Sequence, residues 1–181
     1  MSHCIHIFGA SGSGVTTLGE YLGNQLDAEV LDTDSYYWEI TDPPFTEKKS
    51  PEGRIAAIEK DIHGVEKWIL SGSLCSWGEP LLHRFNLVVF LYLESSIRME
   101  RIIHRERERF GNRIEPGGDM RDTHVNFIDW ARSYDYAKAP TRSLDLHEKW
   151  MKQLSCPIIR LDSSVPTSEL CRQILDTGLY L

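Results

Sequence analysis

The chain has 181 residues and a formal net charge of −7, from 20 Lys and Arg against 27 Asp and Glu. Its length predicts one domain that spans residues 1–181. With 41% hydrophobic and 26% charged residues, the composition is typical of soluble globular proteins and argues against disordered, collagen-like and membrane-spanning chains. The acidic balance argues against general nucleic-acid binding, which depends on neutralising phosphates.

The chain shows neither a membrane segment nor a metal or disulfide framework. Its longest apolar run, 87–93, is too short to cross a bilayer, and its first residues lack the basic start and long apolar stretch of a secretory signal. The four cysteines, Cys4, Cys75, Cys156 and Cys171, form no C-x-x-C pair. We therefore expect a cytoplasmic protein with no membrane partner.

Short apolar segments alternate with helical segments along the chain. We expect strands at 3–8, 28–31, 68–70, 87–93 and 157–161, and helices at 15–26, 54–63, 95–110, 122–138, 143–154 and 168–175. This alternation predicts parallel strands joined by helical crossovers, hence an α/β three-layer sandwich with a five-stranded parallel sheet. In such sheets ligands bind beyond the carboxyl ends of the strands.

A glycine-rich turn follows the first predicted strand. The phosphate-binding loop pattern is G-x-x-x-x-G-K-[ST]; Gly9, Gly14 and Thr16 match it in register, and Val15 takes the place of the lysine. Small residues let backbone N–H groups curl around a phosphate at the positive end of a helix. We expect ATP on this loop and Mg²⁺ on the Thr16 hydroxyl. The expected contact residues are Gly9, Ala10, Ser11, Gly12, Ser13, Gly14, Val15, Thr16 and Thr17.

The missing lysine removes the cation that usually bridges the β- and γ-phosphates. Losing one preorganised charge typically lowers a rate by about 10²–10³-fold, and binding tolerates the loss better than catalysis does. The loop therefore supports nucleotide binding more strongly than rapid phosphoryl transfer.

The order of strand, loop and helix resembles the P-loop nucleoside and nucleotide kinase group, which includes adenylate kinase-like and shikimate kinase-like enzymes and proteins described as AAA-type ATPases. The resemblance covers nearly the whole chain. It implies a P-loop NTPase fold and Mg²⁺-dependent transfer of a phosphoryl group from ATP to a small acceptor: a nucleotide, a nucleoside or a small metabolite. Val15 departs from the pattern, so a nucleotide-binding regulator or slow NTPase is the alternative.

A dinucleotide-binding interpretation is weaker. Asp32 lies about 20 residues beyond the loop, as a ribose-binding acid would. Tyr134 and Lys138 have the Tyr-x-x-x-Lys spacing of short-chain NAD(P)-dependent dehydrogenases, but G-x-G-x-x-G fails because Thr17 stands where its last glycine belongs. Tyr134 also lies one helical turn from Trp130, and we expect both side chains to pack in the interior.

Two carboxylates end the second predicted strand. Asp32 and Asp34 point the same way if the extended conformation continues. The segment resembles the Asp-x-Asp turn of shikimate kinase-like proteins, which implies that Asp32 holds the Mg²⁺ shell and that Asp34 orients or deprotonates the acceptor hydroxyl. The alternative is a solvated turn capped by its own carboxylates.

Aromatic, basic and small residues follow the next elements. Tyr36, Tyr37 and Trp38 stack on a base, wall an acceptor pocket, or anchor their own loop by packing. Arg54 either grips an acceptor carboxylate or phosphate or forms a surface ion pair. Gly72, in the turn after the third strand, lets the backbone approach the acceptor. We expect Asp34, Tyr37, Arg54 and Gly72 to bind the acceptor.

The predicted helix 95–110 is rich in arginine. Arg98, Arg101, Arg105 and Arg109 fall on one helical face, where neighbouring glutamates or an anionic ligand would offset their repulsion. The kinase resemblance implies a lid over the donor phosphates at about 105–121. We expect Arg105 and Arg109 to be catalytic, with Arg113 third, and one of them to replace the missing lysine.

Overall fold

The computed structural model describes residues 3–179, and its centre is a five-stranded parallel sheet. The strands are β1 (His3–Gly9), β2 (Glu29–Asp32), β3 (Lys67–Ser71), β4 (Leu87–Tyr92) and β5 (Ile158–Asp162). Their order is β2-β3-β1-β4-β5, and each adjacent pair is parallel. The central strand β1 sets the register: Ile5 lies opposite Ile69 on one side and Leu87 on the other.

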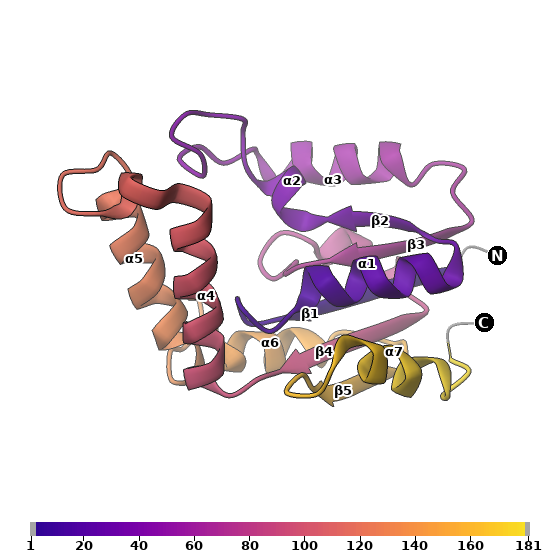
Figure 1. The fold of residues 1–181 in the computed structure, drawn as a ribbon. Coiled ribbons are helices and arrows are strands. Elements are labelled where there is room, and N and C mark those ends of the chain that lie inside the picture. The colour runs from indigo at the N-terminus through magenta and orange to yellow at the C-terminus, as the bar shows by residue number, and fades with distance from the viewer. Residues whose placement is uncertain (1–2, 180–181) are drawn as a thin grey trace.

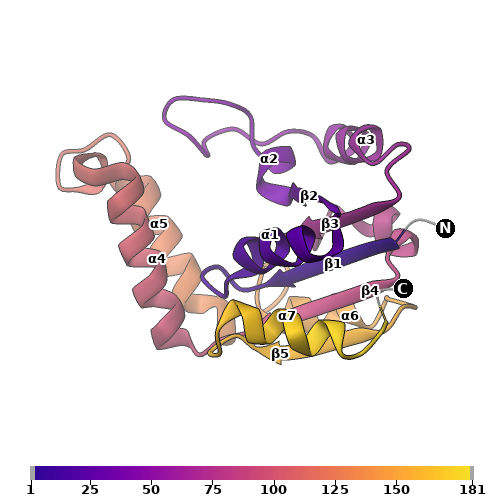
Figure 2. The same ribbon diagram turned by 45° about the vertical axis from the view of Figure 1, so that its right-hand side comes forward.

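Helices cover both faces of this sheet (Figures 1 and 2). They are α1 (Val15–Leu26), α2 (Thr33–Tyr37), α3 (Pro51–Asp61), α4 (Ser95–Phe110), α5 (Arg121–Arg132), α6 (Leu144–Met151) and α7 (Thr167–Leu175). Short 3₁₀ turns occupy Glu79–Arg84, Gly111–Ile114 and Ser133–Asp135. The expected α/β sandwich with five parallel strands is confirmed.

Alternate residues of β1 divide the interior into two hydrophobic clusters. Ile5 and Ile7 face Leu18 of α1, in the cluster that also includes α7. Cys4 and Phe8 face the opposite way, into the cluster that holds residues of α3 and α6. Because successive side chains of a strand point to opposite faces, a strand covered on both sides is predominantly apolar.

Helices α4 and α5 form an arm that projects from the carboxyl edge of the sheet (Figure 2). Ile102 of α4 packs against Ile128 and Ala131 of α5, a cluster separate from the two sheet clusters. None of the helices in residues 3–179 is long and apolar enough to cross a membrane.

Four local expectations differ from the structure. The helix expected at 54–63 spans Pro51–Asp61, because the Ser50 side chain accepts a hydrogen bond from the Gly53 amide and caps it. The helix expected at 122–138 ends at Arg132, where a 3₁₀ turn begins, and the one expected at 143–154 ends at Met151. The segment after β2 is helical rather than extended, because the Asp32 side chain accepts a hydrogen bond from the Asp34 amide and so caps α2.

Candidate functional site

A large cavity of about 1080 Å³ lies at the carboxyl edge of the sheet. The loop after β1 lines it together with residues that follow β2 and β3, and α4, α5 and the segment before α6 enclose it. Figure 1 shows how the arm formed by α4 and α5 faces the loop between α2 and α3 across this edge. This is where a parallel α/β sheet is expected to bind ligands.

The glycine-rich loop has a tight conformation stabilised by its own groups. Both the amide and the hydroxyl of Ser13 donate to the Ala10 carbonyl oxygen, at 3.2 and 2.7 Å. Gly12 has φ of +82°, and a Cβ there would lie 2.8 Å from the carbonyl oxygen of Arg98. The loop therefore packs against the start of α4 in a form that requires glycine.

Most backbone amides of this loop lack a protein acceptor. Within residues 3–179 no protein oxygen accepts a hydrogen bond from the amides of Ser11, Gly12, Gly14, Val15, Thr16 or Thr17. Helix α1 also has no side-chain cap and no acidic residue in its first turn. Uncapped amides at a helix N-terminus favour a bound anion, so the loop is free to hold phosphate.

Thr16 and Asp32 come together beside the loop. The Thr16 hydroxyl donates to Oδ2 of Asp32 at 3.2 Å, and both residues line the cavity. Hydroxyl and carboxylate oxygens suit Mg²⁺, which usually takes only one or two protein ligands and completes its shell with water and phosphate oxygens. No group of three His, Cys, Asp or Glu side chains among the described residues is arranged to hold a metal. The pair fits Mg²⁺ bound together with a nucleotide.

Asp34 lies on a helix, which corrects the expectation of two parallel carboxylates on an extended strand. It occupies the first turn of α2, and its amide donates to Oδ1 of Asp32 at 2.9 Å. The Asp34 side chain still lines the cavity. Burial, and next the charge of Asp32, raises the pKa of Asp34, which makes this carboxylate a better proton acceptor. Asp32 both caps α2 and contacts Thr16.

Two of the three adjacent aromatic side chains face the cavity. Tyr37 and Trp38 line it, whereas the Tyr36 hydroxyl points away and donates to Asp61 at 2.8 Å. The ammonium group of Lys48 lies 5.7 Å from the ring centre of Tyr37 and 5.8 Å from that of Trp38. Tyr37, Trp38 and Lys48 thus form one wall of the cavity, with the cation held by the two rings.

Arg54 supports this wall from behind. It is buried, with 5% of its surface exposed, so the alternative of a surface ion pair is wrong. Its guanidinium carbon lies 3.8 Å from the ring centre of Tyr37 and 5.4 Å from that of Trp77. Arg54 is not among the residues that line the cavity. The structure thus places Arg54 beneath Tyr37 instead of on the cavity surface.

Gly72 lines the cavity at the end of β3. Its φ is +113°, and a Cβ there would overlap the hydroxyl of Thr33. Glycine at this position lets the turn after β3 pack directly against the start of α2, which carries Asp34.

The arginines of α4 separate into two groups. Arg101, Arg105 and Arg109 line the cavity. Arg98 does not share their environment: it is buried and donates to the Leu93 carbonyl oxygen at 2.9 Å and to Asp135 at 2.5 Å. The expectation of four arginines on one ligand-facing surface is therefore wrong for Arg98, which instead fixes the base of the arm.

Arg113, the third expected lid cation, lies outside the cavity lining. Its guanidinium pairs with Asp42 at 2.7 Å and with Asp119 at 2.6 Å. Asp42 belongs to the loop between α2 and α3, so Arg113 connects that loop to the end of the arm.

Arg142 is a functional candidate that the sequence analysis missed, and Trp130, expected to pack in the interior, is only half-buried and faces the cavity. Both line the cavity, and the guanidinium carbon of Arg142 lies 4.4 Å from the Trp130 ring centre. Nη2 of Arg142 donates to the hydroxyl of Ser11 at 3.1 Å. Nothing in the local pattern around Arg142 signals this contact, because Ser11 is 131 residues away in the chain.

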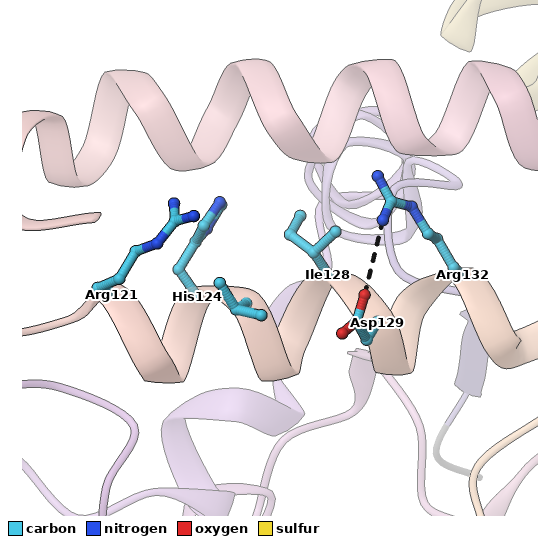
Figure 3. A pocket seen from close by; sticks show the side chains of 6 residues that line it. Arg121, His124, Ile128, Asp129 and Arg132 are labelled. Carbon is cyan, nitrogen blue, oxygen red and sulfur yellow. Dashed lines mark ion pairs between the residues drawn. The ribbon is translucent and has the colours of Figure 1, made fainter. Parts of the chain in front are cut away.

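A second hollow, about 270 Å³, lies on the arm. Figure 3 shows that its lining side chains come from α5 alone, with Arg132 paired to Asp129 at 3.6 Å. It lies apart from the glycine-rich loop and the carboxyl edge of the sheet. We therefore assign the candidate site to the large cavity.

Comparison with known proteins identifies a relative over nearly the full length. The chain is 44% identical to the uncharacterized protein YqaC of Bacillus subtilis (strain 168) over 176 residues, which cover 97% of each chain. The chain belongs to the YqaC family. No protein-family model matches it.

The fold of this YqaC-family chain is shared with solved kinases. It is similar to shikimate kinase from Bacteroides thetaiotaomicron, with a TM-score of 0.58 and 19% identity over 98% of each chain. It also matches a gluconokinase from Sinorhizobium meliloti 1021, with a TM-score of 0.51 and 17% identity over 99% of this chain and 93% of that one. These neighbours are P-loop kinases of the adenylate kinase-like group, so the expected P-loop kinase fold is confirmed.

Proposed function

We propose that this protein is a Mg²⁺-dependent kinase that transfers the γ-phosphoryl group of ATP to a hydroxyl of a small metabolite. The observation that carries the proposal is one cavity in which uncapped loop amides, the Thr16–Asp32 pair and the carboxylate of Asp34 meet. Phosphoryl transfer needs little more from a protein than positioning and charge stabilisation.

On the donor side, the loop from Gly9 to Thr17 would hold the ATP phosphates through its free amides. Thr16 and Asp32 would hold Mg²⁺, which supplies charge neutralisation between the β- and γ-phosphates when bound. Arg105 and Arg109, which line the same cavity from α4, add positive charge along it.

On the acceptor side, Asp34 would orient the attacking hydroxyl and accept its proton. Its raised pKa favours proton uptake as the oxygen attacks phosphorus. Tyr37 and Gly72 would shape the acceptor pocket, while Arg54 holds the Tyr37 ring in place. A small metabolite is the preferred acceptor because two neighbours of the same fold are named for gluconate and shikimate.

The segment 105–121 would act as the lid, closing the arm over the donor phosphates. The ion pair between Arg113 and Asp42 would carry the loop between α2 and α3 along with it. We also propose that the protein works in the cytoplasm, since Cys75, Cys156 and Cys171 are free thiols.

Nucleotide binding is tested first, by thermal shift with ATP, GTP, ADP and NAD, each with Mg²⁺. We expect ATP and ADP to raise the melting temperature of the wild type. Gly12→Ala should abolish the shift, because the new methyl group meets the Arg98 carbonyl and distorts the loop. Gly64→Ala is the matched control: Gly64 also has positive φ, +79°, but a Cβ there contacts nothing within 4 Å.

Phosphoryl transfer is tested next, by ADP release with a panel of sugar acids, hydroxylated carboxylic acids, nucleosides and nucleoside monophosphates. A rise in ADP release with one acceptor class supports the kinase. ATP binding and slow hydrolysis without any acceptor effect would support the second candidate, a slow NTPase or nucleotide-binding regulator, which Val15 in place of lysine favours. A shift with NAD alone would overturn both in favour of a dehydrogenase.

A further inference from the structure

The loop lacks its own cation because Val15 stands where the lysine is usual. Two arginines approach the loop. Nη2 of Arg142 lies 3.1 Å from the Ser11 hydroxyl, and Nη1 of Arg101 lies 4.0 Å from the Cβ position of Gly14. Arg109 instead has its guanidinium carbon 5.0 Å from the ring centre of Phe45, at the outer part of the cavity.

Arg142 carries a charge that no carboxylate neutralises directly. Within residues 3–179 it forms no ion pair, although Arg98, Arg113 and Arg160 each pair with an acid. Its Nε is buried and has no hydrogen-bond partner among those residues. Burial lowers the pKa of Arg142, and the charge of Asp34 opposes this effect. A desolvated guanidinium with free donors is a site for an anion.

Arg142 lies where the two halves of the site meet. It contacts Ser11 of the phosphate loop, and among the residues that act on its charge are Asp34 and Tyr37 on the acceptor side. All four residues line the same cavity. A phosphoryl group that moves from a nucleotide on the loop to a hydroxyl beside Asp34 passes between these groups.

Several contacts fix the position of Arg142. Its guanidinium stacks on Trp130, with the carbon 4.4 Å from the ring centre. The next residue, Ser143, is fully buried and caps α6 by accepting a hydrogen bond from the Leu146 amide at 3.2 Å. One turn on, His147 is buried and bonded to Ser73 and Tyr134. Charges held in place before the reaction stabilise a transition state best.

We propose that Arg142 is a catalytic residue that stabilises the phosphoryl group during transfer, in place of the absent loop lysine. This inference rests on the proposed function. The acceptor oxygen forms a bond to the γ-phosphorus while the bond from that phosphorus to the β–γ bridging oxygen breaks. ADP leaves with that electron pair, and the hydroxyl proton passes to Asp34. Arg142 donates hydrogen bonds to the non-bridging oxygens and keeps its own protons.

The test compares Mg·ADP affinity with and without aluminium fluoride, which mimics the phosphoryl group in transfer. Isothermal titration calorimetry is run on the wild type, Arg142→Met, Arg142→Lys and Arg132→Met. Arg132→Met is the matched control, since it removes an arginine from neighbouring α5 whose partner is Asp129 and which lies outside the cavity (Figure 3). Thermal melting confirms that each variant is folded.

In the wild type, aluminium fluoride should tighten Mg·ADP binding. Arg142→Met should reduce that tightening by about 10²–10³-fold while Mg·ADP affinity alone stays within about threefold, because the interaction belongs to the transition state. Arg142→Lys should recover part of the tightening, since it keeps the charge but loses the paired donors. If Arg142→Met does not fold, Arg142→Lys provides the test. A partial loss of the tightening in Arg142→Lys supports the inference, and wild-type tightening overturns it.

Three results overturn the inference. Arg142→Met could keep the full tightening, or it could weaken Mg·ADP by the same factor with and without aluminium fluoride, which would make Arg142 a ground-state binding residue. A wild type that binds Mg·ADP without any tightening also overturns it. A wild type that binds no adenine nucleotide refutes the proposed function itself, so the two failures are distinct.

Discussion

Acid should destabilise the protein between pH 7 and pH 5 because two histidines are buried without charge. His6 is fully buried, stacks on Phe8 and Phe85, and contacts the Leu70 carbonyl oxygen through Nδ1 at 3.0 Å. Burial lowers the pKa of His6 to about 3, against the smaller opposing effect of that hydrogen bond. Burial, and next the charge of Arg142, lowers the pKa of His147 to about 3 as well.

The direction and size of the effect follow from proton linkage. Below about pH 6.5 the unfolded chain protonates both side chains, whereas the folded protein keeps them neutral until about pH 3. The unfolded state then binds more protons, so the free energy of unfolding falls as pH falls. Between pH 7 and pH 5 each histidine removes about 2 kcal/mol, and the two together remove about 4 kcal/mol. That is a large part of the about 5–15 kcal/mol typical of a domain.

The assay is urea unfolding at pH 7, 6, 5.5 and 5, with the wild type, His6→Phe and His83→Gln. Phe keeps the aromatic packing of His6 and cannot be protonated. We expect His6→Phe to lose about 2 kcal/mol less than the wild type between pH 7 and pH 5. His83 is exposed, so His83→Gln should follow the wild-type pH profile.

Protonation of ion-paired carboxylates changes the free energy of unfolding of all three proteins by the same amount. This contribution therefore cancels when their pH profiles are compared. If His6→Phe shows the same dependence on pH as the wild type, the folded protein must accommodate a charged His6. The burial argument would then be refuted.

Three substitutions around the cavity test its other groups. Asp34→Asn should lower phosphoryl-transfer turnover by about 10²–10⁴-fold and leave Mg·ATP affinity within about threefold, as steady-state kinetics and calorimetry would show; unchanged turnover removes Asp34 from the chemistry. Gly72→Ala should lower the free energy of unfolding by at least about 1–3 kcal/mol, measured in urea, because φ is +113° and the methyl group meets the Thr33 hydroxyl; a neutral result contradicts that geometry. Arg113→Ala should leave the melting temperature nearly unchanged but speed protease cleavage within 38–50, because it frees Asp42; equal cleavage rates would show that this ion pair does not hold the loop.

Local pattern was enough to predict the sheet, the main helices and the place of the glycine-rich loop. The bounds of α1 and α4 match the expectation, and the five strands lie within a few residues of theirs, because burial on both faces demands continuous apolar runs. The glycine loop could be recognised because its glycines, small residues and following helix are contiguous in the chain.

The sequence pattern gave wrong predictions for side chains whose position depends on contacts with residues distant in the chain. Helical spacing placed Arg98 with Arg101 and Arg105, but Asp135 and the Leu93 carbonyl hold it in the interior. Arg54 has the right chemistry for an acceptor, yet it lies under Tyr37 and not on the cavity surface.

By itself the sequence determined that this chain folds as a parallel α/β sandwich with a glycine-rich loop before its first helix, since those features come from the order and polarity of neighbouring residues. Only the tertiary structure decided which cation reaches that loop. Arg142 belongs to the segment before α6 and donates a hydrogen bond to Ser11. The two residues are close because the capped start of α6 packs beside the carboxyl edge of the sheet and the arm, where the cavity lies. Contacts between residues so far apart in the chain follow from packing of the whole fold, and no local spacing encodes them.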